Sequence, residues 1–594
     1  MRTPTPRRHR PSAGQRLTPL LVLLLGLNGI SCHSELHGSS PLTSDAPDGG
    51  TVGDGTASPD GTIGSEDDGA MGGPIADTQL PAADLGPPPA GSWQSELVHV
   101  AGGRLVYKVE ANGNRLPDYS YAGYKNGAVA LPTVPVKRTV VPGAGDDGAA
   151  IQQAIDQVAQ MPLVDGFRGA VLISKGEYQV AQTLHLHTSG VVLRGEGSDA
   201  DPAANTVIRR TDYATSQALI VGAKSAKGDI GWAAEVAGTR TEITTDFVPV
   251  GAQSFDVANA SLFKVGDNVI VYHPCTDKWL AAVKYGGQPE IGSGWKAGEL
   301  PIVYNRYITA ISGNTITIDV PVFNELDRQL SQSVIYKHDR KSIVTNVGVE
   351  NLRIDIDTKG ETSESHAEMG IEFILVEDGW AKNVAVLHYV QRGFRFSTTT
   401  RVTVTHCKAL EPHSQITGNR RYAFCAQRAQ QILVRDSLAT NARHPFVTDG
   451  ESWDSGNVYY NNVSEGIVDD DGPHRRWATG ILWDNIEHKT PVDYNVFMMQ
   501  NRSDYGSAPQ GWACSNCVAW HYVAPPTNQE GRTTNLVLQR PPKGQNYAIG
   551  CFAGNITGDG KHKLPLGYVE GGNKAGLYPP SLYQAQLAQR LAGR

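Results

Sequence analysis

Apolar and polar residues alternate in short runs over most of the chain, which is the pattern of half-buried β-strands. Clear examples are residues 169–180, 183–197 and 205–210. Strand-like runs of this kind continue to residue 580 with few longer helical stretches between them. The pattern predicts an all-β body.

A helical pattern is clear at two places. Residues 145–160 place apolar side chains on one helical face, and Asp146 or Asp147 precedes them as a candidate cap. Residues 581–591 form the second candidate, at the C-terminus. We therefore predict one helix before the strands and one after them.

From residue 345 onward, short runs repeat a polar residue followed by an apolar one. The polar positions are Asn351, Asn383, His406, Asp436, Asn462, Asn485, Asn516 and Gly550, spaced 23 to 34 residues apart. One turn of a parallel β-helix takes about 20–35 residues, and stacked turns bury an inner face that no single turn could bury. We expect the polar residues to mark a bend of each coil, often stacked as an Asn ladder.

Two other all-β folds fit the spacing less well. A propeller needs a steadier period of about 40–50 residues, and tandem sandwiches need regularly spaced Asn-Gly or Asp-Gly hairpins. Residues 225–335 do break the rhythm, with alternating runs at 262–273 and 307–322 and a Gly-Asn turn at 313–314. We predict an inserted antiparallel β unit there, packed on the side of the solenoid near its groove.

Three segments resemble the entry to proteins of the pectate lyase superfamily: residues 115–132, 145–159 and 169–197. The resemblance covers about residues 103–580 and implies a right-handed parallel β-helix with an N-terminal capping helix. Lys175 departs from it, because proline usually precedes the glycine that Gly176 represents. The superfamily includes lyases, hydrolases, epimerases and phage tailspikes, so the fold alone does not fix the chemistry.

The first 95 residues are predicted to be a leader and a tether. Residues 1–31 carry five arginines, no acid and a short apolar run at 17–27, as in a signal peptide. Cys32 resembles a lipoprotein processing site, although Gly29 stands where leucine is usual; plain secretion is the alternative. Residues 32–95 are acidic and rich in Gly and Pro, and we expect a disordered tether.

The charge of the chain follows this division. The net charge is −8, and residues 33–95 contain ten acidic residues and no basic one. The predicted β-helix domain, residues 96–594, is therefore close to neutral. This balance argues against nucleic acid as the main partner.

Three successive predicted coils each supply arginine together with histidine or tyrosine. The groups are Arg420, Arg421 and Tyr422; Arg443 and His444; and His474, Arg475 and Arg476, with His413 beside the first. Their offsets of 22 and 32 residues each correspond to one coil. Side chains one coil apart on the same face lie about 4.8 Å apart. We expect the three groups to meet as one electropositive patch.

Such a patch suits the β-elimination of a uronic-acid polymer. The reaction needs a cation on the carboxylate, a base for the C5 proton and an acid for the leaving oxygen. His444 or His474 is the candidate base, Tyr422 the candidate proton donor, and Arg421, Arg443 and Arg475 the carboxylate clamps. Arg420, Arg476, His413, Trp453 and Trp477 are the candidate substrate-binding residues. Alternatively, these groups only form ion pairs with nearby acids such as Asp436 and Asp449.

Asp469, Asp470 and Asp471 offer a second chemistry. Paired carboxylates can hydrolyse a glycosidic bond, although the segment only approximates the aspartate and Gly-His-Gly pattern of polygalacturonase-type hydrolases. The same oxygens could hold Ca²⁺, which bridges substrate carboxylates in classical pectate lyases. No other cofactor is expected.

Three of the cysteines and two of the other tryptophans are expected to be structural. Six cysteines remain besides Cys32, an even number that permits disulfides, and the single C-x-x-C at 514–517 is a weak redox or zinc signal. Cys407, Cys514 and Cys551 fall in strand-like runs and are predicted to be buried thiols. Trp483 and Trp520 also fall in strand-like runs and are expected in the core or at its rim.

The sequence therefore predicts an exported β-helix protein, at the cell surface or outer membrane through a lipid on Cys32, or secreted. The favoured function is a lyase that cleaves an acidic polysaccharide. The alternatives are an inverting glycoside hydrolase and a glycan-binding or adhesive β-helix without catalysis. We expect a monomer that contacts a membrane only through its anchor.

Overall fold

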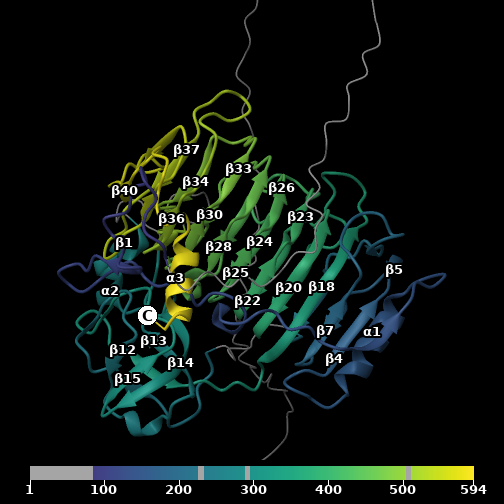
Figure 1. The fold of residues 1–594 in the computed structure, drawn as a ribbon, viewed down its shortest axis with the longest axis horizontal. Helices are drawn as coiled ribbons and strands as arrows, with labels where there is room; N and C mark the ends of the chain where they lie inside the picture. Colours follow the sequence, from purple (N-terminus) through teal and green to yellow (C-terminus); the bar gives the residue numbers. More distant parts are fainter. Residues whose placement is uncertain (1–84, 225–232, 288–293, 504–509, 594) are drawn as a thin grey trace, which may run out of the picture. The chain divides into compact units, whose positions relative to one another are not determined.

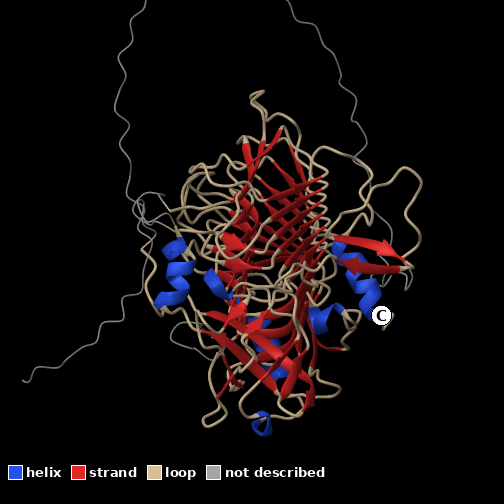
Figure 2. Ribbon diagram, turned by 90° about the vertical axis from the view of Figure 1, so that its left-hand side faces the viewer, coloured by secondary structure: helices blue, strands red, loops and turns tan. Residues whose placement is uncertain are grey.

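Parallel strands from successive coils stack into three sheets that enclose one core, which confirms the predicted parallel β-helix (Figure 1). The computed structural model describes residues 85–224, 233–287, 294–503 and 510–593, all within one unit, Asp67–Arg594. The predicted signal segment, Cys32 and most of the tether lie outside the described residues. Seen from the side, the strands form a ladder and the helices lie outside it (Figure 2).

The first sheet is parallel from its first strand to its last. Its strands are β3 (Val136–Val140), β4 (Gly169–Ile173), β7 (Val191–Arg194), β18 (Val344–Ile356), β20 (Val376–Leu387), β22 (Thr400–Thr405), β25 (Leu433–Arg435), β28 (Val458–Tyr460), β32 (Leu482–Asp484), β36 (Val518–Trp520), β38 (Tyr547–Ile549) and β40 (Tyr568–Glu570). A small parallel pair, β31 (Ala478–Thr479) and β35 (Cys514–Ser515), lies before β32 and β36.

The second sheet begins where each coil bends away from the first. Its strands are β5 (Gly176–Val180), β8 (Thr206–Arg210), the second halves of β18 and β20, β23 (Lys408–Leu410), β26 (Leu438–Thr440), β29 (Val463–Glu465) and β33 (Glu487–Lys489). Because β18 and β20 run through the bend, the two sheets are continuous there.

The third sheet completes each coil. Its strands are β6 (Leu184–Leu186), β9 (Gln217–Gly222), β19 (Met369–Ile374), β21 (Arg392–Ser397), β24 (Tyr422–Gln427), β27 (His444–Thr448) and β30 (Gly472–Pro473). A single bridge between Asp471 and Phe497 continues it into β34 (Asn495–Met499), β37 (Asn535–Leu538) and β39 (Asn555–Thr557).

The bend between the first two sheets is the repeat seen in the sequence. Residues with positive φ mark it in eight coils: Asn351, Asn383, His406, Asp436, Asn461, Asn485, His521 and Gly550. Asn and Gly adopt this left-handed conformation more readily than other residues. Part of the expected ladder forms, since Asn383 Nδ2 donates to Asn351 Oδ1 at 3.0 Å and His521 Nδ1 pairs with Asn485 Oδ1 at 2.6 Å.

Two of the predicted bend positions were wrong. Asn462 lies one residue beyond the bend, fully buried, where its side chain accepts from Ser437 N and donates to Val434 O. Asn516 belongs to the other bend, between the third and first sheets, together with Gly480. Both bends take the left-handed conformation, so the residue type alone does not tell them apart.

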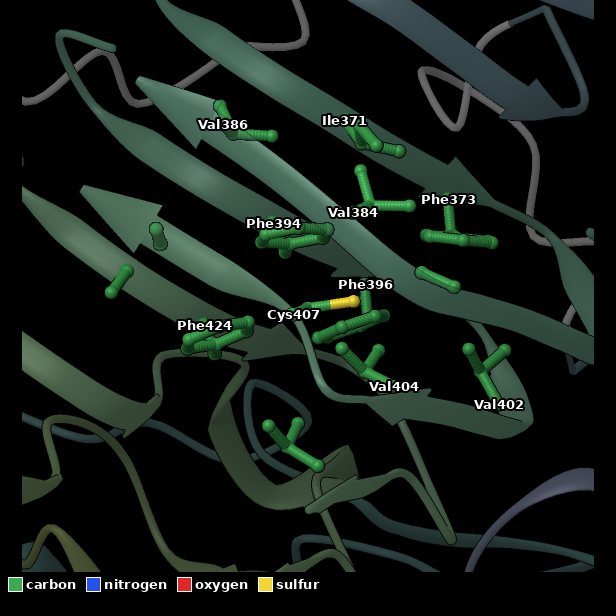
Figure 3. Close-up of a cluster of buried hydrophobic side chains, with 14 of the residues drawn as sticks. Ile371, Phe373, Val384, Val386, Phe394, Phe396, Val402, Val404, Cys407 and Phe424 are labelled. Carbon is green, nitrogen blue, oxygen red and sulfur yellow. The ribbon is translucent and has the colours of Figure 1, made fainter. Parts of the chain in front are cut away.

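Inside the solenoid, side chains of the same type stack on one another from coil to coil, most clearly in a row of phenylalanines. The rings of Phe394 and Phe424 stack at 4.9 Å, and the rings of Phe424 and Phe446 at 5.7 Å. Figure 3 shows Phe394 and Phe424 of this row beside the aliphatic side chains and Cys407 that fill the same interior. Rings of neighbouring coils therefore cover one another, which removes their faces from water.

The segment between β9 and β18 forms the predicted antiparallel unit. Its strands are β10 (Thr241–Glu242), β11 (Phe247–Val248), β12 (Ser254–Asp256), β13 (Asn268–His273), β14 (Ile302–Ser312), β15 (Thr315–Ile318), β16 (Leu326–Asp327) and β17 (Val334–Lys337). Six of them make one sheet, and the predicted turn at 313–314 joins β14 to β15. Buried Glu377 of β20 connects the solenoid to this unit. It forms an ion pair with Arg340 at 2.7 Å and accepts a hydrogen bond from Tyr307 Oη at 2.7 Å, and both residues belong to the inserted segment.

Two of the described helices lie at the predicted places, within residues 145–160 and 581–591, and a third, in the antiparallel unit, was not predicted. They are α1 (Gly148–Ala159), α2 (Asp277–Ala282) and α3 (Leu582–Leu591), with short 3-10 turns at Tyr124–Gly127, Ala260–Leu262, Lys284–Gly286 and Glu451–Trp453. α1 buries Ile151, Ile155 and Val158 against the first coil, and Ser581 caps the start of α3, where its hydroxyl accepts from Gln584 N. None of the described helices is long and apolar enough to cross a lipid bilayer.

The outer faces of the sheets differ in what covers them. Outward apolar residues of the first sheet, such as Val458, Leu482 and Trp520, are buried under α3, the antiparallel unit and the hairpin β1 (Val98–Ala101)–β2 (Arg104–Tyr107). On the third sheet, Ile220 and Ile374 pack against the antiparallel unit, and the outer face from β21 to β27 instead carries mainly polar and charged side chains. This face is where the candidate site lies.

Replacing Phe424 by alanine tests the ring stack. We expect the free energy of unfolding to fall by about 3–5 kcal/mol, because a buried ring is lost between two others and leaves a cavity. Urea unfolding of the full chain measures the change. Val141→Ala is the control, since Val141 is 66% exposed and should change the value by less than about 0.5 kcal/mol. Equal midpoints for Phe424→Ala and wild type would contradict the stack's role.

Candidate functional site

The outer face of the third sheet gathers polar side chains at the N-terminal ends of its strands. In-register pairing sets Arg392 of β21 opposite Tyr422 of β24, and Tyr422 opposite His444 of β27. Two residues further along, Phe424 and Phe446 point into the core. The usual alternation is interrupted here, because Ala423 and Phe424 both face the core, and Tyr422 faces outward together with Cys425.

Tyr422, His444 and His474 form a compact group, named here the Tyr422–His444–His474 cluster. Ring centroids lie 4.7 Å apart for Tyr422 and His444 and 4.8 Å apart for the two histidines. Tyr422 Oη lies 3.3 Å from His474 Nε2. Tyr422 and His444 are 1% exposed, whereas His474, just after β30, is half-buried. His474 is thus the member that solvent reaches.

A buried carboxylate holds two arginines beside this cluster. Asp449 accepts from Arg475 Nε at 2.6 Å and from Arg392 at 3.2 Å. The Arg392 guanidinium also lies 5.1 Å from the Tyr422 ring centroid. Arg475 remains 24% exposed in its side chain, while Asp449 and Arg392 are buried. Arg475 is therefore a positioned cation at the surface of the cluster.

A second group of ion pairs lies on the other side of His444. Arg443 binds Asp469, and Arg502 binds Asp470 at 3.2 Å. The backbone carbonyl of Asp470 accepts from His444 Nδ1. This bond leaves Nε2 as the unprotonated nitrogen of a neutral His444 ring.

The carboxylates of this group do not suit a calcium ion. His444, Asp469 and Asp470 bring one ligand atom each within 4.8 Å of one another. However, the guanidinium groups of Arg443 and Arg502 already bind the two carboxylates, and Ca²⁺ requires six to eight oxygen ligands. Arg443 and Arg502 thus already neutralise the two carboxylates that a metal cation would bind.

Burial keeps both histidines of the cluster neutral. Burial lowers the pKa of His444 to about 3, with Arg443 adding to the effect. Burial also lowers the pKa of His474 well below its usual value, and Arg502, His444 and Arg475 lower it further. The pKa of Tyr422 is raised by burial, so its hydroxyl stays protonated. Near pH 7 the cluster thus holds two neutral imidazoles and a neutral phenol.

Two ring nitrogens of the cluster have no partner within the part of the chain that the structure describes. His444 Nε2 and His474 Nδ1 are both buried and accept no hydrogen bond there. Buried polar atoms without a partner are rare in native proteins and often mark functional sites. The cluster can therefore accept protons or bind a polar group.

The other predicted arginines lie apart and are paired. Arg420 forms a bidentate pair with Glu364, Arg476 binds Glu451 at 2.6 Å, and Arg421 donates to Ser414 O at 2.6 Å. The expectation of one electropositive patch was wrong, because each arginine on these coils lies beside a carboxylate or a carbonyl. A charge leaves water only with a partner that compensates it.

Three other predicted residues also lie outside the cluster. His413 packs on His388 at 4.4 Å between ring centroids. Trp453 is half-buried, with Arg428 5.6 Å from its ring centroid. The prediction that Trp477 faces substrate was wrong, because its side chain is fully buried between Trp279 and Trp295.

Asp471 was wrongly grouped with the two aspartates before it. It is fully buried, and its Oδ1 accepts from Phe446 N at 2.9 Å. Its Oδ2 lies 3.5 Å from His488 Nε2, in the next coil. The side chain thus belongs to the hydrogen bonding of the core.

Arg392 and Arg502 are site residues that the sequence analysis did not identify. Arg392 lies one coil before Tyr422, and the offset of 30 residues was a signal that could have found it. Arg502 follows β34 and reaches back by one coil to Asp470. No repeat predicts this contact, since it depends on the path of a loop.

The cysteines of the described chain are all buried free thiols: Cys275, Cys407, Cys425, Cys514, Cys517 and Cys551. The prediction for Cys407, Cys514 and Cys551 is confirmed, as is the burial of Trp483 and Trp520. Burial raises the pKa of Cys425 to about 12, although Cys425 lies on the same outer face as Tyr422. It is therefore not a nucleophile at neutral pH.

No protein-family model matches the chain, and no curated protein sequence matches it. Among solved structures, it is similar to the tailspike protein gp49 from Pseudomonas phage LKA1, with 15% identity and a TM-score of 0.43. That match covers 68% of this chain and 57% of the tailspike. The chain thus spans little more than half of that protein's length.

Two other solved structures are similar at lower scores. An alginate lyase from Paenibacillus sp. str. FPU-7 has 8% identity and a TM-score of 0.36, over 74% of this chain and 99% of the lyase. The A-module of the mannuronan C-5 epimerase AlgE4 from Azotobacter vinelandii has 13% identity and a TM-score of 0.29, over 74% and 96%. The parallel β-helix itself is evident from this chain's own strand pairings.

Asp449→Asn tests the buried ion pairs of the site. Burial acts to raise the pKa of Asp449, but Arg475 and Arg392 outweigh it and hold the pKa below its usual 3.8. The pairing therefore stabilises the fold fully above about pH 3.8, and this contribution is lost as pH falls through the lower, folded-state pKa. At pH 7 the variant should be about 3–5 kcal/mol less stable, since buried Arg392 and partly exposed Arg475 lose their shared partner.

Urea unfolding at several pH values measures this effect. The difference between wild type and Asp449→Asn should narrow as the solution becomes acidic. The control is Glu465→Gln, which removes a half-exposed partner of Lys489 at 3.8 Å and should cost at most about 1 kcal/mol. A difference that is the same at every pH would exclude titration of Asp449 as its source.

Proposed function

We propose that the chain is a polysaccharide lyase that cleaves a uronic-acid polymer by β-elimination at the Tyr422–His444–His474 cluster. The observation that carries the proposal is the contact of Tyr422 Oη with His474 Nε2 at 3.3 Å, beside the partly exposed Arg475. To these three side chains, which lie together on one face of the solenoid, we assign the roles of proton acceptor, proton donor and carboxylate-binding cation.

Each group has one role in the proposed reaction. His474 accepts the C5 proton of the uronate, and the electrons of that C–H bond form the C4–C5 double bond. The C4–O bond breaks, and the leaving oxygen takes the proton of Tyr422. The imidazolium of His474 then returns a proton to the Tyr422 phenolate through their contact.

Arg475 would bind the uronate carboxylate. Asp449 fixes its guanidinium from behind, so little side-chain entropy is lost on binding. The bound carboxylate also brings a negative charge close to His474, which raises the pKa of an imidazole. In the free chain burial keeps His474 a weak base, and an acidic substrate would make it a stronger one.

Glycoside hydrolysis is the second candidate, favoured by one observation. Burial raises the pKa of Asp470, while His444 and Arg443 outweigh the burial of Asp469 and lower the pKa of that carboxyl. A pair with separated pKa values is typical of acid and base. However, the two lie within 4.8 Å, less than the roughly 6.5–9.5 Å that inverting hydrolysis needs. A binding module without catalysis is the third candidate.

The remaining expectations are part of the same proposal. An extracellular polymer requires export, and residues 1–31 with Cys32 supply the candidate signal and lipid anchor. The substrate would reach the chain at the cell surface or in the medium. We also propose a monomer, since each role is assigned to a residue of one chain.

The direct test is incubation of the purified chain with a panel of uronate polymers. A lyase produces an unsaturated uronide, which absorbs in the ultraviolet. His474→Ala should reduce turnover by about 100-fold or more, the usual contribution of a general base, and Tyr422→Phe should reduce it as well. His413→Ala is the matched control, because that ring lies on His388 and outside the cluster.

Three results would contradict the proposal. New reducing ends without ultraviolet absorbance would mean hydrolysis. Retardation in a glycan-containing gel without any product would mean binding only. Full turnover by His474→Ala would exclude this histidine as the base.

Chelation tests the place of calcium. Because Arg443 and Arg502 bind the two carboxylates, we expect turnover to stay unchanged after treatment with a calcium chelator. Measuring the rate before and after calcium is added back completes the experiment. A loss of activity that calcium restores would show that the ion supports the reaction.

A further inference from the structure

A second concave site lies away from the Tyr422–His444–His474 cluster. It is a cavity of about 520 Å³, within the usual size of ligand sites, and it shares no residue with the cluster. We propose that it binds an acidic saccharide, so that the chain holds its polymer at two places. It is called the Arg540 cavity below, after a residue that lines it.

Three parts of the fold make most of the wall of the Arg540 cavity, and Trp512, Asn516, Leu564 and Pro565 also line it. Residues 110–115 follow the β1–β2 hairpin, residues 284–287 and Glu325 belong to the antiparallel unit, and residues 540–547 join β37 to β38. These segments are far apart in the sequence. Only the folded chain creates the cavity, so a periodic sequence pattern does not predict it.

Positive charge exceeds negative charge on this wall. Arg115, Lys284, Arg540 and Lys543 line the cavity, against two carboxylates, Glu110 and Glu325. Lys543 binds Glu325 at 2.7 Å. Within the described ranges, the other three cations have no carboxylate at salt-bridge distance. An anionic ligand would supply the missing partner.

Neutral polar groups stand among these cations. Amide side chains of Asn112, Asn114, Asn516 and Gln545 line the same cavity and suit hydroxyl groups. Trp512 and Tyr547 add aromatic surface at the wall. Charge, amides and aromatic rings together fit a carboxylate-bearing sugar better than a small inorganic anion.

Part of the wall is fixed before any ligand binds. Asn516 Nδ2 donates to Phe323 O at 3.0 Å, and its Oδ1 accepts from Gln545 N at 3.1 Å. The Arg115 guanidinium lies 5.0 Å from the Tyr107 ring centroid and donates to Gly251 O at 3.2 Å. Such preorganisation lowers the entropy lost on binding.

The choice of a uronate rests on the proposed function, but the test of the cavity does not require catalysis. Titration calorimetry of the full chain uses three probes: uronate tetrasaccharides, a neutral cellotetraose and inorganic phosphate. We expect saturable binding of at least one uronate, with much weaker binding of the other two probes. Wild type and the inactive His474→Ala variant should bind alike.

Arg540→Ala and Lys284→Ala should each weaken uronate binding tenfold or more. Neither side chain forms an ion pair among the described residues, so the fold should be preserved; circular dichroism and urea unfolding check this. The matched control is Arg328→Ala, since Arg328 lies on the antiparallel unit outside the cavity and is 42% exposed. Its affinity should equal that of wild type.

The outcomes separate this proposal from the lyase proposal. Binding that depends on Arg540 and Lys284, without any unsaturated product, supports the cavity and contradicts the lyase. Turnover together with unchanged binding by both variants overturns the cavity alone. Failure of every uronate to bind, or equal binding of phosphate or cellotetraose, also overturns it.

Discussion

In-register stacking of parallel coils is the constraint on which the rest of this structure depends. Each coil places its side chains about 4.8 Å from the equivalent ones of the next. Inside, this spacing lets Phe394, Phe424 and Phe446 cover one another's faces. Outside, the same register sets Arg392, Tyr422 and His444 in one row. The core and the candidate site are thus two faces of one arrangement.

The side chains of the candidate site are buried although they lie on the outer face of the third sheet, and this explains why its charged groups form ion pairs. Tyr422, His444 and Asp449 are almost inaccessible, although they lie outside the coil. A charged side chain that is buried needs a partner of opposite charge. Asp449 is that partner, and it accepts hydrogen bonds from both Arg392 and Arg475. His444 and His474 have no carboxylate in hydrogen-bonding contact. Burial therefore lowers the pKa of each ring, and both histidines stay neutral. Burial therefore leaves proton acceptors beside fixed cations.

The sequence predicted the contacts that follow from the spacing of the coils. It did not predict the contacts made by the insertion and by single loops. Coil spacing brought Tyr422, His444 and His474 together, because register carries one position to the next. It failed for Trp477, since a tryptophan before a strand can turn inward against Trp279 and Trp295, which belong to an insertion of unpredictable position. It failed for Asp471, because three consecutive aspartates cannot all point the same way from an extended chain. Arg502 depends on a loop that no other coil repeats.

The antiparallel unit and α3 cover only part of the outer surface of the solenoid, and this determines which surfaces remain open to a ligand. The antiparallel unit and α3 pack on the apolar outer face of the first sheet, as Trp520 and Leu482 show. That packing closes the face, but where residues 540–547 meet the unit it leaves the Arg540 cavity. The unit also covers Ile220 and Ile374 of the third sheet, whereas the outward side chains from β21 to β27 are mostly polar. An insertion that packs on the solenoid thus adds a concave surface where it meets residues 540–547, and the part of the third sheet that carries Tyr422 and His444 keeps its polar face.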